Sequence, residues 1–128
     1  MKQEILQFHY EELIYILMIL SSDLKKYKEE ELIIFAEAIT RLETLSDIKF
    51  LKKLKLINPN FNEEIIKKVI NLKKILSEIY TGQWYKKLKN NNIINKAFAV
   101  SKKILEELKE EYVEPIEYSR KNMEVKWT

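Results

Sequence analysis

The chain has few of the residues on which common active sites are built. Its 128 residues include no cysteine, one glycine, one histidine and two prolines. Without cysteine there is no disulfide, no thiolate nucleophile and no thiolate metal ligand. One glycine is too few for a phosphate-cradling loop, a dinucleotide-binding fingerprint or a nucleophile elbow. The composition therefore excludes most chemistry that depends on cysteine or glycine.

The single histidine, His9, completes no recognisable catalytic or metal-binding motif. Di-iron bundles use paired Glu-x-x-His motifs, and a helical zinc site takes two histidines. His9 lies beside Leu6 and Tyr10, which favours a packed, hydrogen-bonded histidine over a catalytic one. Adjacent glutamates such as Glu11 and Glu12 diverge by about 100° on a helix, so we expect them to be solvated. We therefore expect no enzyme activity, no cofactor and no metal.

Residues 13–20 form the one unbroken apolar run that needs checking as a membrane or targeting segment. A membrane helix takes about 20 such residues. The run follows Glu4, Glu11 and Glu12 instead of the basic flank of a signal peptide. We interpret it as a buried central helix of a soluble protein with no membrane partner. We expect a cytoplasmic protein, either of a microbe or of an infected host cell.

Apolar residues recur at helical spacing along the chain, and no segment alternates like a strand. Long helical stripes span residues 6–24, 32–42, 65–79 and 94–112, and short ones span 48–54 and 84–88. We expect the last long helix to end before Pro115, because proline disrupts a helix interior. The pattern predicts an all-α fold: a single compact antiparallel helical bundle of four long helices plus one or two short ones.

We assign the bundle to residues 1–115 and a C-terminal tail to residues 116–128. The tail has no clear period, so it is either docked or mobile. Its aromatic residues, Tyr118 and Trp127, favour folding back, because an isolated exposed tryptophan promotes association.

Local signals mark the ends of the helix over residues 65–79. Asn62 is a good N-cap, and the two glutamates after it favour the positive end of the helix dipole. Phe61 can pack on Ile66 as a hydrophobic staple. Gly82 is suited to a left-handed C-cap. The preceding short helix must end before Pro59.

Charge is distributed unevenly along the chain. Residues 46–103 hold fourteen lysines against four carboxylates. Residues 1–45 hold nine acidic and five basic residues, and residues 104–128 hold seven and four. The formal net charge of +3 therefore conceals a basic middle between two acidic ends.

Our leading hypothesis is a non-catalytic protein-binding module whose basic middle docks an acidic surface of a larger protein. Opposite charge would speed association, and aromatic side chains would anchor the interface. By general analogy alone, such small helical proteins include immunity proteins, antitoxins and phage or viral anti-defence inhibitors, which act by occluding a target. The residues expected to face the partner are Lys52, Lys53, Lys67, Lys68, Lys73, Lys74, Trp84, Tyr85, Lys86, Lys87 and Lys89.

The alternative function is binding of RNA or DNA backbone through the same lysines. Trp84 and Tyr85 would then stack on bases beside the charges that neutralise phosphate. With only two arginines in the chain, specific base readout is disfavoured.

A third interpretation is that the lysines simply solubilise the outer faces and pair with glutamates of the same chain. Several helices are also apolar on more than one face, which allows self-association.

Overall fold

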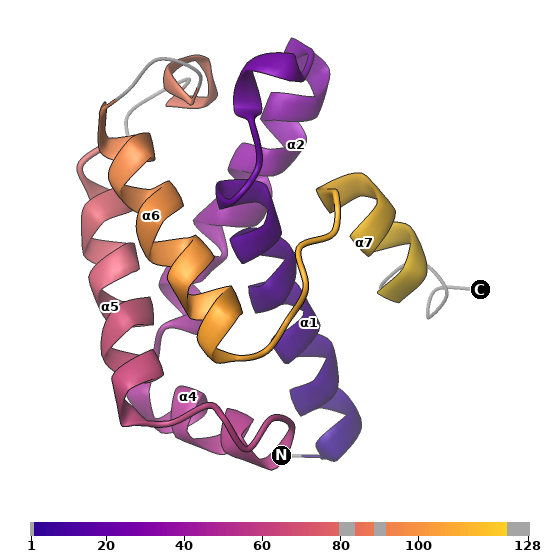
Figure 1. Cartoon of the computed structure of the whole chain (residues 1–128), viewed down its shortest axis with the longest axis vertical. Helices are drawn as coiled ribbons and strands as arrows, with labels where there is room; N and C mark the ends of the chain where they lie inside the picture. The colour runs from indigo at the N-terminus through magenta and orange to yellow at the C-terminus, as the bar shows by residue number, and fades with distance from the viewer. Residues whose placement is uncertain (1, 80–83, 89–91, 123–128) are drawn as a thin grey trace.

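The computed structural model describes residues 2–79, 84–88 and 92–122, and every regular element in these ranges is helical (Figure 1). The all-α expectation is confirmed. None of the described helices is long and apolar enough to cross a membrane. With η denoting a 3₁₀ helix, the elements are α1 (Gln3–Leu20), η1 (Leu24–Lys26), α2 (Glu29–Thr40), α3 (Leu42–Leu45), α4 (Ile48–Lys53), η2 (Leu54–Leu56), α5 (Glu63–Ser77), η3 (Trp84–Lys87), α6 (Asn92–Glu107) and α7 (Pro115–Asn122).

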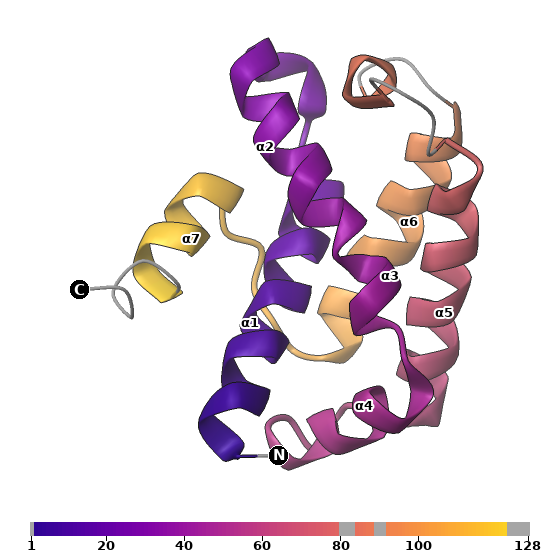
Figure 2. The same ribbon diagram turned by 180° about the vertical axis from the view of Figure 1, so that it is seen from behind.

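The centre of the fold is α1, whose second half is apolar on all sides. Leu13, Ile14 and every residue from 16 to 20 are at most 1% exposed. A helix that is apolar all round must be surrounded by protein. Accordingly α2, α3, α6 and α7 all contact α1 (Figures 1 and 2). The prediction of a buried central helix is confirmed.

The finer expectation, a bundle of four long helices with one or two short ones, is not confirmed in that form. The long helices are α1, α2, α5 and α6, but α3, α4 and α7 are further short α-helices. Packing is uneven as well, because α5 contacts α6 and α4 while α4 crosses one end of the molecule (Figure 2). The short elements arise where residues that favour caps and turns recur, at Ser46, Asp47, Asn58 and Pro59.

The start of α5 is as predicted. The Asn62 side chain accepts a hydrogen bond from the backbone N–H of Ile65, at 3.1 Å, and Phe61 and Ile66 are both buried. The helix ends at Ser77, before the expected end at Gly82, which lies outside the described residues. The short helix expected over residues 84–88 is present as η3.

The end of α6 differs from the expectation of a helix running almost to Pro115. The helix ends at Glu107, and Lys109 adopts the left-handed conformation with φ of 60°. The backbone N–H of Glu110 donates to the carbonyl of Leu105 at 2.9 Å, which is the long bond of a Schellman motif. The chain therefore leaves the helix early, turns at Leu108 and Lys109, and returns over α1 without regular structure; we call residues 108–114 the return segment (Figure 1).

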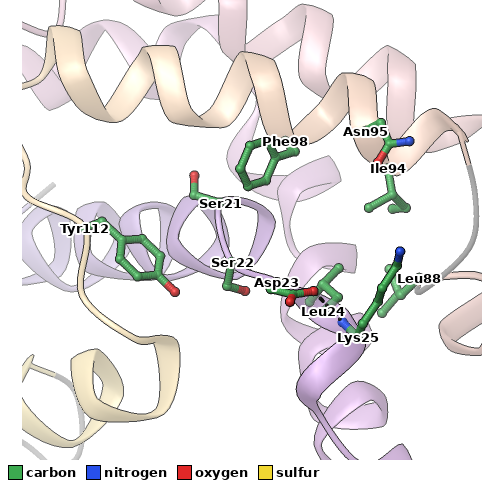
Figure 3. A pocket seen from close by; sticks show the side chains of 10 residues that line it. All are labelled: Ser21, Ser22, Asp23, Leu24, Lys25, Leu88, Ile94, Asn95, Phe98 and Tyr112. Atoms are coloured by element: carbon green, nitrogen blue, oxygen red, sulfur yellow. Dashed lines mark hydrogen bonds between the residues drawn. The ribbon is translucent and has the colours of Figure 1, made fainter.

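This early ending changes the predicted apolar stripe of α6. Tyr112 lies outside the helix and is 47% exposed, and Phe98 is 37% exposed. Both residues belong to the apolar helical stripe predicted over residues 94–112. Phe98 instead projects from the side of α6 that faces the return segment. Tyr112 is part of that segment (Figure 3).

The return segment is fastened to α1 at its start by a polar cluster. The Tyr10 hydroxyl donates to Glu110 at 2.7 Å, and the Asn58 amide donates to the Tyr10 oxygen at 2.9 Å and to the Leu108 carbonyl at 3.0 Å. Burial raises the pKa of Tyr10, against the donation from Asn58, and the Glu110 carboxylate adds to the rise. Tyr10 therefore stays protonated and acts as a donor.

A second tyrosine fastens the end of the return segment. The Tyr27 hydroxyl donates to Glu114 at 2.5 Å. Partial burial raises the pKa of Glu114, but hydrogen bonds from Tyr27 and from the backbone N–H groups of Glu117 and Ile116 outweigh it, and the net pKa is lowered. The carboxylate is therefore held in its charged form at neutral pH.

Beyond this contact α7 packs on α1. Its Tyr118 is 7% exposed, and burial, followed by the charges of Glu11 and Glu110, raises the pKa of Tyr118. The described part of the predicted tail is thus a docked helix, whereas Trp127 lies outside the described residues.

Replacing Lys109 by glycine should stabilise the protein. A residue with a Cβ atom pays roughly 1 kcal/mol or more to adopt the left-handed conformation, and glycine avoids this cost. We expect the Lys109→Gly free energy of unfolding, measured by urea denaturation, to rise by about 1 kcal/mol. Lys109→Ala is the control and should show no such gain. Equal stabilities of the glycine and alanine variants would contradict the assigned C-cap.

Removing the Tyr27 hydroxyl should destabilise the protein most at neutral pH. The pKa of Glu114 is lower in the folded chain than its ordinary value of 4.5, so its contribution is present above that value and is lost as the pH falls through the folded pKa. We expect Tyr27→Phe to lose about 1 kcal/mol at pH 7 by urea denaturation. The difference from the unmodified protein should shrink in acid.

The control for this experiment is Tyr85→Phe, whose hydroxyl makes only a 3.4 Å contact with Glu29. It should change stability by less than about 0.5 kcal/mol. A Tyr27→Phe loss that is the same at every pH would show that the Glu114 hydrogen bond is not its cause.

Candidate binding surfaces

One end of the molecule, formed by α4 and η2, concentrates positive charge beside exposed apolar side chains. Residues 48–56 contain four lysines and no carboxylate. The segment begins after Asp47, in the N-cap position, and is held down by Leu51 and Leu54, both fully buried. We call this surface the basic end. It consists of the exposed residues Ile48, Lys49, Lys52, Lys53, Lys55 and Leu56.

The charges of the basic end are not neutralised within the described part of the chain. No ion pair found there includes any of its four lysines. Ile48 is 49% exposed and Leu56 is 74% exposed, the highest value among the exposed large apolar side chains. Uncompensated charge gives long-range attraction, and exposed apolar area gives binding energy when it is covered. The basic end combines both.

The lysines of α5 are divided among different sides of that helix. Lys67 and Lys74 are exposed on its outer line, since residues seven apart face the same way. Glu64 and Glu78 lie on the same line and are also exposed. The Lys67 ammonium group is 3.8 Å from Glu64. This line therefore alternates in sign and is a weaker positive surface than the basic end.

Lys68 and Lys73, both half-buried, do not join that outer line. Each is next to an outward lysine, and adjacent helical residues diverge by about 100°. Lys68 bonds to Glu107 of α6 across the α5–α6 contact. The sequence allowed lysines to pair with the glutamates of residues 106–117, but it did not identify this pair, whose partners are 39 residues apart. Pairing within the chain, the third interpretation above, therefore holds for Lys68.

The predicted aromatic part of the surface lies on η3, at the other end of α5 from α4 (Figure 1). Tyr85 is half-buried, packs against the core and has its hydroxyl 3.4 Å from Glu29. Lys86 is exposed. Trp84 and Lys87 belong to η3, while Lys89 lies outside the described residues. The ten predicted residues that the structure describes are thus spread over α4, α5 and η3.

Glu11 and Glu12, which were expected to be solvated, are instead buried or bonded to other side chains. Glu11 is 8% exposed. Glu12 accepts from Arg41, with the Nε to Oε2 distance at 3.2 Å, and lies 2.6 Å from Nδ1 of His9. His9 also makes an edge contact with Phe50 of α4. The expected packing role of His9 agrees with these contacts, which link α1 to α2 and α4.

The described residues also form a groove along the flank of α6. Two adjoining pockets of about 530 and 440 Å³ share Ser21 and Tyr112. Figure 3 shows Phe98 and Asn95 reaching into the larger one from α6, with Ser21 and Ser22 at the end of α1 opposite. The larger pocket is lined by Ser21, Ser22, Asp23, Leu24, Lys25, Leu88, Ile94, Asn95, Phe98 and Tyr112.

The polar groups of the groove do not form a catalytic arrangement. The Asp23 carboxylate accepts from the backbone N–H of Lys25 at 3.1 Å and so caps η1. The Ser22 hydroxyl donates to the Ile19 carbonyl at 2.6 Å. Ser21 has a buried hydroxyl without a hydrogen-bond partner, but no histidine lines either pocket to act as its base.

The described residues contain no group of three or more His, Cys, Asp or Glu side chains placed to hold a metal ion. Comparison of the chain with protein-family models, with curated proteins and with solved structures found no match. The case for a function therefore comes from the chain's own surfaces, of which the basic end carries the clearest chemical signal.

Proposed function

We propose that this protein is a non-catalytic binding module that docks an acidic surface of a larger protein through its basic end. By covering that surface it acts as an inhibitor, in the manner of immunity proteins, antitoxins or anti-defence proteins. The observation that carries the proposal is the coincidence, on one short segment, of the exposed Ile48 and Leu56 with four exposed lysines that form no ion pair among the described residues.

The composition of the basic end supports a protein partner in particular. An interface needs apolar contacts at its centre and charge around it for steering. Leu56 and Ile48 supply the apolar part, and Lys52 and Lys53 supply the charge. The buried anchors Leu51 and Leu54 attach this surface to the core, so little conformational entropy is lost when a partner binds.

Nucleic-acid binding is less well supported. It relied on Trp84 and Tyr85 stacking beside the lysines. Tyr85 is half-buried at the other end of α5 from the basic end, and the exposed apolar residues at the basic end are aliphatic, which stack poorly on bases. Nucleic-acid binding is therefore the alternative result that the capture experiment below can detect.

Charge reversal at the basic end tests the proposal. Tagged protein is used to capture partners from a native lysate of the source cells. We expect the unmodified chain to retain one acidic protein in stoichiometric amount, and Lys52→Glu with Lys53→Glu to lose it, with affinity reduced tenfold or more, or about 1.4 kcal/mol. Titration of the captured protein then measures the affinity of each variant.

The matched control reverses the same number of charges on α5, as Lys67→Glu with Lys74→Glu. It should retain the partner, because these residues lie outside the basic end. Leu56→Ser should weaken binding without changing its salt dependence, since it removes apolar contact only. Equal capture by both double variants would refute the assigned surface. Capture abolished by nuclease treatment would favour the nucleic-acid function instead.

A further inference from the structure

The outer face of α2 carries a second exposed surface, of opposite charge to the basic end. Glu30, Ile33, Ile34 and Glu37 follow the spacing of a single helix face. Ile34 is 57% exposed and Ile33 is 36% exposed, and both glutamates are exposed. In the described part of the chain neither glutamate takes part in an ion pair. We call these four residues the acidic stripe.

The acidic stripe and the basic end are complementary. Each presents two exposed aliphatic side chains on a short helical segment together with charges of one sign, negative on α2 and positive on α4 and η2. Covering the aliphatic side chains removes apolar surface from water. The opposite charges attract each other, whereas two surfaces of the same charge repel. Each surface thus has the chemistry that the other would recognise.

One chain does not bring its two surfaces together. Both views show α2 in the upper half of the molecule and α4 crossing its lower end (Figures 1 and 2). The opposite surfaces can therefore meet only when they come from different molecules. Such a contact between unlike surfaces closes as a two-fold dimer when both pairs form at once, and otherwise repeats head to tail as a ring or a filament.

We propose that a second copy of this chain docks its acidic stripe on the basic end, which produces salt-sensitive self-association. This contact does not require the outside partner of the proposed function, although the two compete for the basic end. An acidic partner displaces the second copy, so assembly holds the basic end covered until that partner is present.

Sedimentation-velocity ultracentrifugation of the purified full chain tests self-association. At about 0.01 M salt, where charges act over roughly 30 Å, we expect the mean mass to rise with protein concentration above the 15.5 kDa of one chain. At about 1 M salt, where that range is roughly 3 Å, the mass should return to that of one chain. A monomer at every concentration in low salt would overturn the proposal.

Charge reversal on each surface identifies the contact. Glu30→Lys with Glu37→Lys should abolish self-association, as should Lys52→Glu with Lys53→Glu. Combining all four substitutions restores opposite charges across the contact and should recover association. Glu78→Lys with Glu111→Lys, which changes the same number of exposed glutamates elsewhere, is the matched control and should still associate.

These variants also separate this proposal from the proposed function. The stripe variant, Glu30→Lys with Glu37→Lys, leaves the basic end intact, so it should remain monomeric yet still capture the acidic partner. Self-association without any captured partner would refute the proposed function alone. Association that persists in both double variants would refute the pairing of the acidic stripe with the basic end alone. Circular dichroism checks that every variant is folded.

Discussion

The whole structure depends on burying α1. From residue 13 onward this helix is apolar on every side, and all of its side chains except the half-buried Tyr15 are almost completely removed from water. Burying one such side chain contributes roughly 1.5–3 kcal/mol, so the remaining chain is driven to cover all faces of the helix. The helices α2, α3, α6 and α7 do so. Because each can offer only its apolar stripe to α1, its charged residues are left outside.

The covering of α1 also explains where the surfaces of interest lie. The α6 helix covers one side of α1 and ends early at Lys109, so the return segment must cross α1, where Tyr10 and Tyr27 hold it. The groove occurs between that segment and the flank of α6. The short α4 lies across the end of the molecule, where Leu51 and the Phe50 contact with His9 attach it. Its lysines are exposed, and in the described part of the chain none of them forms an ion pair.

Local patterns in the sequence predicted the elements with local causes. The helical spacing of apolar residues located α1, α2, α5 and α6, and Asn62 was recognised as a cap because its partner is three residues away. The same reasoning failed at the end of α6, because a lysine in the left-handed conformation carries no local signature comparable to glycine. The same reasoning assigned Lys68 to the partner-facing surface, because Glu107, with which Lys68 pairs, is distant in sequence. It also did not single out the acidic stripe, whose complement lies on another helix.

The amino-acid sequence by itself determined that the protein is helical, that residues 13–20 are buried, and that common cysteine and glycine chemistry is excluded. These properties follow from composition and from the spacing of neighbouring residues. Only the tertiary structure decided which lysines are neutralised and which stay free. Within the described residues, the four lysines of the basic end form no ion pair, whereas Lys68 pairs with Glu107. The reason is that Coulomb attraction depends on distance in space, which is set by how the helices pack around α1.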